Sequence, residues 1–334
     1  MLVVAIDVMS GDQGVPERLA GALAALGADT ALHALLVGPP ADLEPLLRAA
    51  PAALRARIEV VAASQVIAMD ELPRAAVRHG RDSSMRIAVN LVREGRAAAC
   101  VSAGNTGALT AISHFVLKTV AGVERAALMA AIPSAVGHTH MLDLGANTRA
   151  TPLQLAQFAR MGSIVARGVH GLARPRVGLL NIGEEDIKGH EGVQAAHALL
   201  SDAAGRDSDY VGFVEGGDIF SGKVDVVVTD GFTGNVALKT MEGLARLIGE
   251  RVRSEFSASW RDRLGGWVAA PVLRRLAAGL DLRRYNGAYM VGLSGVVVKS
   301  HGSAGSMAFA RAVEFAAAAA RTALTAHIAH AFQA

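Results

Sequence analysis

Short apolar runs alternate with longer amphipathic stretches along almost the whole chain. The short runs are rich in β-branched residues and are bounded by glycine and polar residues, which is typical of buried strands. They cover residues 2–6, 34–37, 58–62, 97–101, 141–144, 177–181, 224–229 and 291–298. Apolar residues at helical spacing predict helices over residues 84–94, 106–118, 152–168, 235–252 and 305–332. This alternation predicts an α/β fold in which a mostly parallel sheet carries helices on both faces.

No low-complexity linker and no internal repeat divides the chain, so we expect a single domain over residues 1–334. Residues 254–282 break the alternation of strands and helices and are expected to protrude as an amphipathic helical segment. Apolar residues within that segment follow helical spacing and predict one stripe, made of Phe256, Trp260, Leu264, Trp267 and Val268. Pro271 is expected to interrupt the helix beyond this stripe.

Polar, glycine-rich clusters follow many of the apolar runs, where the carboxyl end of a strand meets the amino end of a helix. They are Asp7–Asp12, Ser102–Gly107, Asp143–Thr148, Asn181–Gly189, Asp230–Asn235 and Lys299–Ser303. Turn and capping chemistry explains any one of these clusters by itself. Ligands in open α/β sheets bind beyond the carboxyl ends of the strands, so we expect the clusters to gather at one edge of the sheet and form a site.

Phosphate is the ligand that the residue types in these clusters favour. Glycines let the backbone approach a ligand closely, and the amino ends of helices present free N–H groups to an anion. Only five of the 33 basic residues are lysines, and three of the five, Lys188, Lys239 and Lys299, lie beside these junctions. We therefore expect phosphate or a phosphate-bearing substrate.

Other chemistries find little support in the sequence. There is no G-x-G-x-x-G fingerprint for a dinucleotide, and Gly217–Lys223 has Walker A spacing but is followed by Val224 instead of serine or threonine. His138 and His140 could share one face of a strand, but no set of Cys and His residues completes a zinc site with them. Cys100 lies inside an apolar strand, where a thiol is usually buried and unreactive. No metal and no cofactor is therefore expected.

Composition narrows the class of protein further. A hydrophobic content of 51% with 19% charged residues indicates an ordered globular chain. The sequence has no signal-peptide pattern and no uninterrupted apolar stretch of bilayer-spanning length, and one cysteine fits a reducing cytoplasm. The net charge of +3 and the isoelectric point near 9.3 favour acidic partners modestly, and no nucleic-acid partner is expected.

The clusters also occur in an order that resembles a known family. The matching motifs are Asp7-x-Met9-x-Gly11-Asp12, Ser83-Ser84-Met85, Ser102-Ala-Gly-Asn-Thr-Gly-Ala-Leu109, Leu142-Asp-x-Gly-Ala-Asn147, Asn181-Ile-Gly-Glu-Glu185 with Lys188-Gly189, Asp230-Gly-Phe-Thr-Gly-Asn235 with Lys239-Thr-x-Glu-Gly243, Tyr285-x-Gly-Ala288 and Lys299-x-His-Gly-Ser303. In these motifs the chain resembles the PlsX family of phosphate acyltransferases over about residues 3–315. It departs from the usual pattern at Ser10, Gln13, Asn286 and Gly305.

The resemblance implies an enzyme that converts acyl-[acyl carrier protein] and inorganic phosphate to acyl phosphate and free carrier, for phospholipid and phosphatidic acid synthesis. It implies a three-layer α/β/α, Rossmann-like fold related to isocitrate and isopropylmalate dehydrogenases, a homodimer, and no cofactor. The implied partners are acyl carrier protein, phosphate, the membrane surface and a membrane glycerol-3-phosphate acyltransferase. The implied location is the cytoplasm, with peripheral attachment to the membrane.

The site residues follow from the clusters and the resemblance together. The expected catalytic residues are Lys188, Lys239, Lys299, His301 and Asn235. The expected substrate and phosphate-binding residues are Asp7, Gly11, Asp12, Ser102, Gly104, Asn105, Thr106, Gly107, Asp143, Asn147, Asn181, Glu184, Glu185, Asp230, Thr233, Gly234 and Ser303. The backbone amides of Ser102–Gly107 and Gly231–Asn235 are expected to bind the phosphate and the oxyanion.

Two surfaces have two interpretations each. Arg74 and Arg78 share a helical face in the densest cationic run of the first half, which is expected either to dock an acidic carrier or to be a solvated surface. The stripe of Phe256, Trp260, Leu264 and Trp267 is expected to contact the membrane, and the alternative is a dimer interface.

Two rival functions remain. An NAD-dependent decarboxylating dehydrogenase on the related fold would need a metal held by carboxylates such as Asp143, Glu184, Glu185 and Asp230. An adaptor at the membrane surface would use the glycine clusters only as turns and would turn over no thioester.

Overall fold

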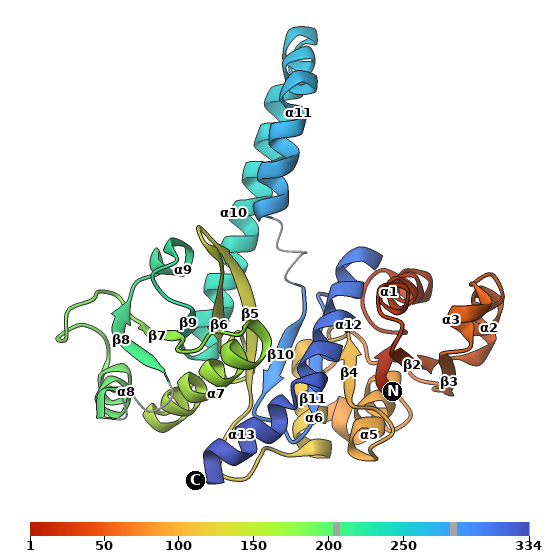
Figure 1. The fold of residues 1–334 in the computed structure, drawn as a ribbon, viewed down its shortest axis with the longest axis horizontal. Coiled ribbons are helices and arrows are strands. Elements are labelled where there is room, and N and C mark those ends of the chain that lie inside the picture. The colour runs from red at the N-terminus through yellow and green to blue at the C-terminus, as the bar shows by residue number, and fades with distance from the viewer. Residues whose placement is uncertain (203–207, 281–285, 334) are drawn as a thin grey trace.

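An eleven-stranded sheet forms the centre of the protein, in the order β3-β2-β1-β4-β11-β10-β5-β6-β9-β7-β8 (Figure 1). The structure, a computed structural model, describes residues 1–202, 208–280 and 286–333. The strands are β1 (Leu2–Asp7), β2 (Leu32–Gly38), β3 (Ile58–Ala62), β4 (Ala99–Ser102), β5 (Ala127–Ser134), β6 (Gly137–Leu142), β7 (Arg176–Leu180), β8 (Asp209–Val214), β9 (Val226–Val228), β10 (Ala288–Val291) and β11 (Val296–Lys299).

The helices precede, follow and connect these strands. They are α1 (Gly14–Ala28), α2 (Pro40–Arg48), α3 (Ala52–Arg55), α4 (Pro73–His79), α5 (Ser84–Arg93), α6 (Thr106–Leu117), α7 (Pro152–His170), α8 (Glu191–Asp202), α9 (Asp218–Ser221), α10 (Gly231–Ser257), α11 (Trp260–Leu280), α12 (Ser306–Arg321) and α13 (Leu324–Gln333). The predicted α/β class and the mostly parallel sheet are confirmed.

Strand direction divides the sheet into two parallel blocks. Strands β3, β2, β1, β4 and β11 run one way, and β6, β9, β7 and β8 run the other way. Between the blocks, β10 is antiparallel to both β11 and β5, and β5 is antiparallel to β6. The two blocks run toward each other, and the registers across β11, β10, β5 and β6 place Met141, next to the end of β6, level with Lys299 at the end of β11. The polar clusters that follow β4, β11 and β6 therefore lie in the same middle region of the sheet, although these strands reach it from opposite directions.

Some elements differ from the sequence prediction. The run 291–298 forms two antiparallel strands, because Gly292 turns the chain at φ +93 and packs tightly against Met161. Strands β5 and β8 were not predicted. The closing helix is broken into α12 and α13, where Ala323 adopts φ +49.

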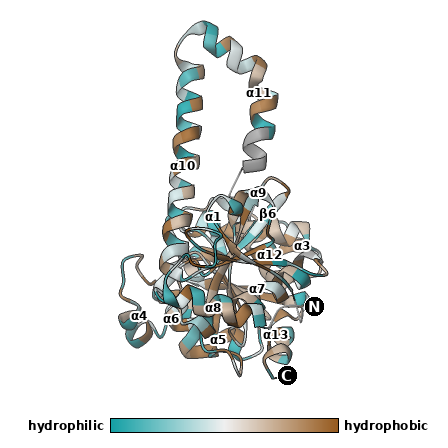
Figure 2. Cartoon of the chain, turned by 90° about the vertical axis from the view of Figure 1, so that its left-hand side faces the viewer, coloured by the Kyte–Doolittle hydropathy of each residue, from teal (hydrophilic) through white to brown (hydrophobic). Residues whose placement is uncertain are grey.

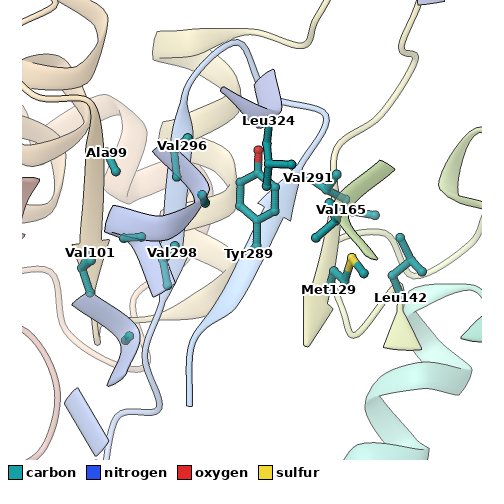
Figure 3. Packing of buried hydrophobic residues seen from close by; sticks show 14 of the residues in the cluster. Ala99, Val101, Met129, Leu142, Val165, Tyr289, Val291, Val296, Val298 and Leu324 are labelled. Atoms are coloured by element: carbon teal, nitrogen blue, oxygen red, sulfur yellow. The ribbon is translucent and has the colours of Figure 1, made fainter. Parts of the chain in front are cut away.

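Both faces of the sheet are covered, as the alternation of side chains along the strands requires. On one face, Val4 and Ile6 of β1 share a core with Phe309 and Val313 of α12. On the other face, Ala5 shares a core with residues of α5 and α6. Figure 3 shows the first core at the middle of the sheet, where side chains of β4, β11 and β10 pack beside those of β5 and β6. Burial of this continuous apolar layer supplies the main stabilisation of the fold.

Helices α10 and α11 form an antiparallel hairpin that stands off the sheet (Figures 1 and 2). The predicted stripe is therefore not on one helix, because Phe256 lies in the last turn of α10 and Trp260 begins α11. Pro271 lies inside α11 and does not end it, which corrects the expected interruption. The structure does not describe residues 281 and 282 of the predicted segment. Tyr285 of the Tyr285-x-Gly-Ala288 motif also lies outside the described residues.

Candidate active site

The amino end of α6 has backbone donors that find no acceptor among the described residues. Asn105 fixes this end, because its Oδ1 accepts the N–H of Ala108 at 3.0 Å and its Nδ2 donates to the carbonyls of Met69 and Glu71 at 2.9 Å. Within the described part of the chain, the N–H groups of Asn105, Thr106 and Gly107 have no acceptor. Free N–H groups at a helix amino end, together with the helix dipole, favour an anion.

A buried network holds the loop before this helix. The Ser102 hydroxyl donates to Asp7 Oδ2 at 2.7 Å, and the N–H of Ala103 donates to Ser10 Oγ at 3.0 Å. A side chain at position 104 would require Met85 to move, because a Cβ there would meet the end of the Met85 side chain. Asp7 is wholly buried, and burial raises its pKa against the opposing effect of its hydrogen bonds. Asp7 therefore positions the loop from behind and does not face a ligand.

Lys299 lies at the end of β11, beside the α6 loop. Only 8% of this residue is exposed, and its Nζ donates to the carbonyls of Ser300 and, at 3.4 Å, Ala103. Burial, followed by the positive charges of Arg18 and Lys239, lowers the pKa of Lys299 to about 8. A half-buried cluster of positive charge next to free backbone N–H groups is an environment that an anion stabilises.

His301 and its neighbours complete this end of the sheet. The imidazole Nδ1 accepts the N–H of Ser303 at 3.2 Å, so a neutral ring carries its proton on Nε2. Burial lowers the pKa of His301, an effect that Glu242 opposes and that Lys239 and Lys299 reinforce. Asp12 is tied to the same loop, because its N–H donates to the carbonyl of Gly302 at 2.9 Å.

Helix α10 carries Lys239 from the other block to this cluster. Lys239 Nζ donates to Glu242 Oε2 at 2.9 Å, and that oxygen lies 4.0 Å from His301 Nε2. Lys239 is eight residues beyond the first residue of the helix, or about 12 Å along its axis. The long helix thus brings Lys239, which comes from the second block, beside the residues that follow β11 in the first block.

The start of α10 is closed by protein groups. The Gly231 N–H donates to the carbonyl of Asn147 at 2.8 Å, and Asp230 accepts the N–H and the hydroxyl of Thr233, both at 2.9 Å. Gly234 packs on the Asp143 carbonyl so closely that a Cβ would overlap it. In this conformation most of the amides expected to bind phosphate here are already used.

Asp143, Asn147 and Asn235 build this closed junction. Asp143 accepts the backbone N–H groups of Leu128 and Asn147 at 2.8 and 2.7 Å, besides those of two further loop residues. Asn235 Nδ2 donates to the carbonyl of Leu144 at 3.1 Å. These polar side chains therefore make their hydrogen bonds to the backbone of the junction.

The loop after β7 is a separate group. Asn181 Nδ2 donates to the carbonyls of Gly183 and Lys188 at 3.1 Å, and the N–H of Lys188 donates to the carbonyl of Glu185 at 2.9 Å. Glu184 pairs with Lys223. Among the described residues, no hydrogen bond or ion pair joins this loop to Lys299, Lys239 or His301.

Arg18 is an important residue that the sequence analysis did not identify. It is wholly buried and donates to three carbonyls, those of Ser10, Gly302 and Ala304, at 3.0, 2.7 and 2.6 Å. These bonds tie the loop after β1 to the loop after β11. Its position could have been found from periodicity, since Arg18 falls on the face of α1 that carries Ala22 and Ala25.

No group of three potential metal ligands occurs among residues 1–202, 208–280 and 286–333. The carboxylates that a metal-dependent dehydrogenase would need are engaged elsewhere: Asp143 with the backbone, Asp230 as a helix cap and Glu184 with Lys223. They do not converge on one point.

Comparison with known families decides the class of this protein. The sequence model of the family described as "Fatty acid synthesis protein" matches residues 2–327. The chain belongs to this family, the PlsX family. Curated relatives from Pseudomonas putida and Alcanivorax borkumensis, both named phosphate acyltransferase, are 53% and 52% identical over 93% and 95% of the chain and 92% and 93% of their own lengths. The protein is therefore an enzyme of the acyltransferase class.

Solved structures of other proteins share the fold. A phosphotransacetylase from Streptococcus pyogenes superimposes with a TM-score of 0.63 at 16% identity, covering 96% of this chain and 94% of that chain. The EutD phosphotransacetylase from Staphylococcus aureus has a TM-score of 0.61 at 17% identity, with the same coverage. A putative 4-hydroxythreonine-4-phosphate dehydrogenase from Salmonella typhimurium has a TM-score of 0.55 at 16% identity, covering 95% and 99%. At these identities the likeness concerns the fold alone. Across the described helices, none combines the length and the apolar character needed to cross a bilayer.

Proposed function

We propose that this phosphate acyltransferase moves an acyl group from the thioester of acyl carrier protein to inorganic phosphate. The observation that carries the proposal is the open amino end of α6 next to Lys299, with Lys239 and His301 beside it. This arrangement suits an anion held against a carbonyl. A dehydrogenase finds no support in the engaged carboxylates.

The reaction needs positioning more than acid or base strength. A phosphate oxygen attacks the thioester carbonyl, a C–O bond forms, and the C–S bond then breaks to release the carrier thiolate. Phosphate is already ionised at neutral pH, and a thiolate with a reference pKa of about 8.5 is a good leaving group. The N–H groups of Thr106 and Gly107 and the ammonium of Lys299 would hold the phosphate and the developing oxyanion, through oriented charges.

The remaining residues have supporting roles in this proposal. Lys239 adds positive charge from α10, and the Nε2 proton of His301 is placed to reach phosphate or the leaving sulfur. Asp12 and Ser303 orient the loop around His301. Lys188 and its loop are proposed to reach the substrate from the β7 side, where the Glu184–Lys223 pair holds the loop.

The α10–α11 hairpin is proposed to serve the membrane and the second subunit. At its tip Trp260 and Trp267 are 66% and 77% exposed, and Leu264 is also exposed, which suits a lipid headgroup boundary flanked by arginines. Phe256 instead packs on Gly266 between the two helices. Exposed Leu244, Leu247 and Ile248 on the shaft of α10 suit a second copy of the chain. Such a location would pass acyl phosphate to a membrane-bound glycerol-3-phosphate acyltransferase and so into phospholipid synthesis.

A co-sedimentation assay separates the two uses of the hairpin. Trp260→Glu should lower binding to anionic vesicles and leave the dimer intact, and Leu247→Glu should give monomers. Membrane binding that survives Trp260→Glu in a protein that has become monomeric would assign the tip to the subunit contact instead.

The proposed reaction is tested by incubating the purified protein with acyl-[acyl carrier protein] and phosphate. Acyl phosphate, trapped with hydroxylamine, should form in proportion to the carrier thiol released. Thiol release at the same rate without phosphate would refute the proposed transfer.

A further inference from the structure

A cavity of about 900 Å³ lies beside the proposed site, along the flank of α6. It is bounded by α4, by α6 from Gly107 to Phe115, and by the Gly145–Asn147 loop. Five arginines line it: Arg74, Arg78, Arg81, Arg86 and Arg125. None of the lining residues is acidic. A volume in this range suits a small organic ligand.

The described part of the chain offers these arginines no ion-pair partner. Among the described residues, no carboxylate lies within 4.0 Å of any of the five. Arg86 is the most constrained of them, because its Nε and Nη1 are buried without an acceptor and its guanidinium lies over the Phe115 ring at 4.9 Å. Burial, with the charges of Arg93 and Arg81, lowers the Arg86 pKa. Unpaired buried donors are unfavourable, so a ligand that accepts from them gains affinity.

The geometry favours one class of ligand. Guanidinium groups bind phosphate oxygens in a two-pronged manner, while Val77, Ala111 and Phe115 offer apolar wall to an attached organic chain. Phe115 is nine residues from Thr106 in the same helix, or about 14 Å along its axis. A ligand anchored at Arg86 could therefore extend along α6 to the free N–H groups at its amino end.

We propose that this cavity binds the phosphate ester of an extended organic arm, with Arg86 as its central contact. Given the proposed function, on which this inference rests, the arm is the phosphopantetheine that links the acyl thioester to its carrier. The arm would lie along α6 with its phosphate at the arginines and its sulfur at the amino end. The face of α4 that carries Arg74 and Arg78 would thus contact the end of the arm that is attached to the carrier protein.

Calorimetry of the full-length protein tests this directly, with 4′-phosphopantetheine as the probe and pantetheine as the probe that lacks phosphate. The phosphorylated arm should bind at least 10-fold more tightly. Arg86→Gln should weaken that binding at least 10-fold, while Arg93→Gln, an exposed arginine on the same helix that pairs with Glu94, should leave it unchanged. Equal binding of pantetheine, or unchanged binding by Arg86→Gln, would overturn the proposal. So would equal displacement by inorganic phosphate, which would make the cavity a simple phosphate site.

A second variant and a second substrate keep the result interpretable. Arg78 is exposed, so the Arg78→Gln variant should fold normally. We expect this variant to lose several-fold in affinity for phosphopantetheine. Turnover of acyl-pantetheine, which lacks the phosphate, should be the same in the wild-type protein and in Arg86→Gln. In one outcome, the wild-type protein binds 4′-phosphopantetheine through Arg86 and still transfers no acyl group to phosphate. That result would refute the proposed reaction and leave the assignment of the cavity intact.

Discussion

The starts of α6 and α10 contain similar residue types and share the same kind of cap, but they differ in the partner of the first helical N–H. Each follows a buried strand and contains Gly, Asn and Thr around a polar cap, Asn105 in one and Asp230 in the other. In α6 the described residues offer no acceptor to three N–H groups beside the Lys299 ammonium. In α10 the Asn147 carbonyl accepts the N–H of Gly231, which corresponds to the N–H of Thr106 in α6. A glycine-rich helix start is therefore an anion site only where the rest of the fold leaves it empty.

Lys299→Met should produce the largest change. Loss of a buried ammonium from a site of developing negative charge should lower kcat/KM about 10²-fold or more, measured as acyl phosphate formed. Lys118→Met is the matched control, since Lys118 is exposed at the far end of α6, and near-parental activity is expected from it. An active Lys299→Met protein would remove the α6 end from the reaction.

The same variant should become more stable. Folding lowers the pKa of Lys299 from 10.5 to about 8, so the folded state binds fewer protons between these values and stability rises with pH there. Below pH 8 the buried charge is a full cost, on the order of 1–3 kcal/mol. Lys299→Met should therefore raise the melting temperature at pH 7, and a lower melting temperature would show that the ammonium stabilises the empty protein.

Removing the side-chain cap of α6 or of α10 should have effects of moderate size, and the two effects should differ in kind. Asn105→Ala should lower kcat/KM about 10-fold or more, because the cap orients the N–H groups at the anion site. Asp230→Ala should cost about 1 kcal/mol of unfolding free energy, as N-cap losses do, with a change in kcat/KM below about 5-fold. Urea unfolding and steady-state kinetics of both variants check this. A larger kinetic loss in Asp230→Ala would reverse the assignment of the two junctions.

A pH profile should show the smallest effect. The Lys299 ammonium is present below its pKa of about 8 and is lost above it, so kcat/KM should fall as pH rises through that value. The measurement needs an acyl thioester that is stable at pH 9. A rate that keeps rising through pH 9 would exclude a required ammonium at this position.

Much of the architecture follows from local pattern, and the assembly of the site does not. The strands around Val4, Val101 and Val227 and the helices α5, α6 and α7 were predicted because periodicity and capping are local. The reversal of strand direction at β10 and β5 depends on which strands pair across the sheet, and no single run of residues encodes it. The sequence predicted one site from the clusters after β6 and β11, but it did not show that these two strands run toward each other.

Individual residues show the same limit. Lys299, Lys239 and His301 were predicted together from motif and charge, and the structure brings them together through the length of α10. Asp143 and Asn147 were predicted as ligands because polar residues after strands often are; in the fold their polar atoms bond the backbone, and their binding to substrate stays a prediction. Arg18 was missed because an arginine on a buried helix face carries no motif of its own.

The position of bound phosphate tests the central claim most directly. A crystal structure of the full chain with phosphate should show the anion within hydrogen-bond distance of the Thr106 and Gly107 N–H groups and of Lys299 Nζ, with Lys239 and His301 next to it. The start of α10 should remain bonded to Asn147 and Asp230. Phosphate seated instead on the Gly231–Asn235 amides, with α6 left empty, would contradict the account.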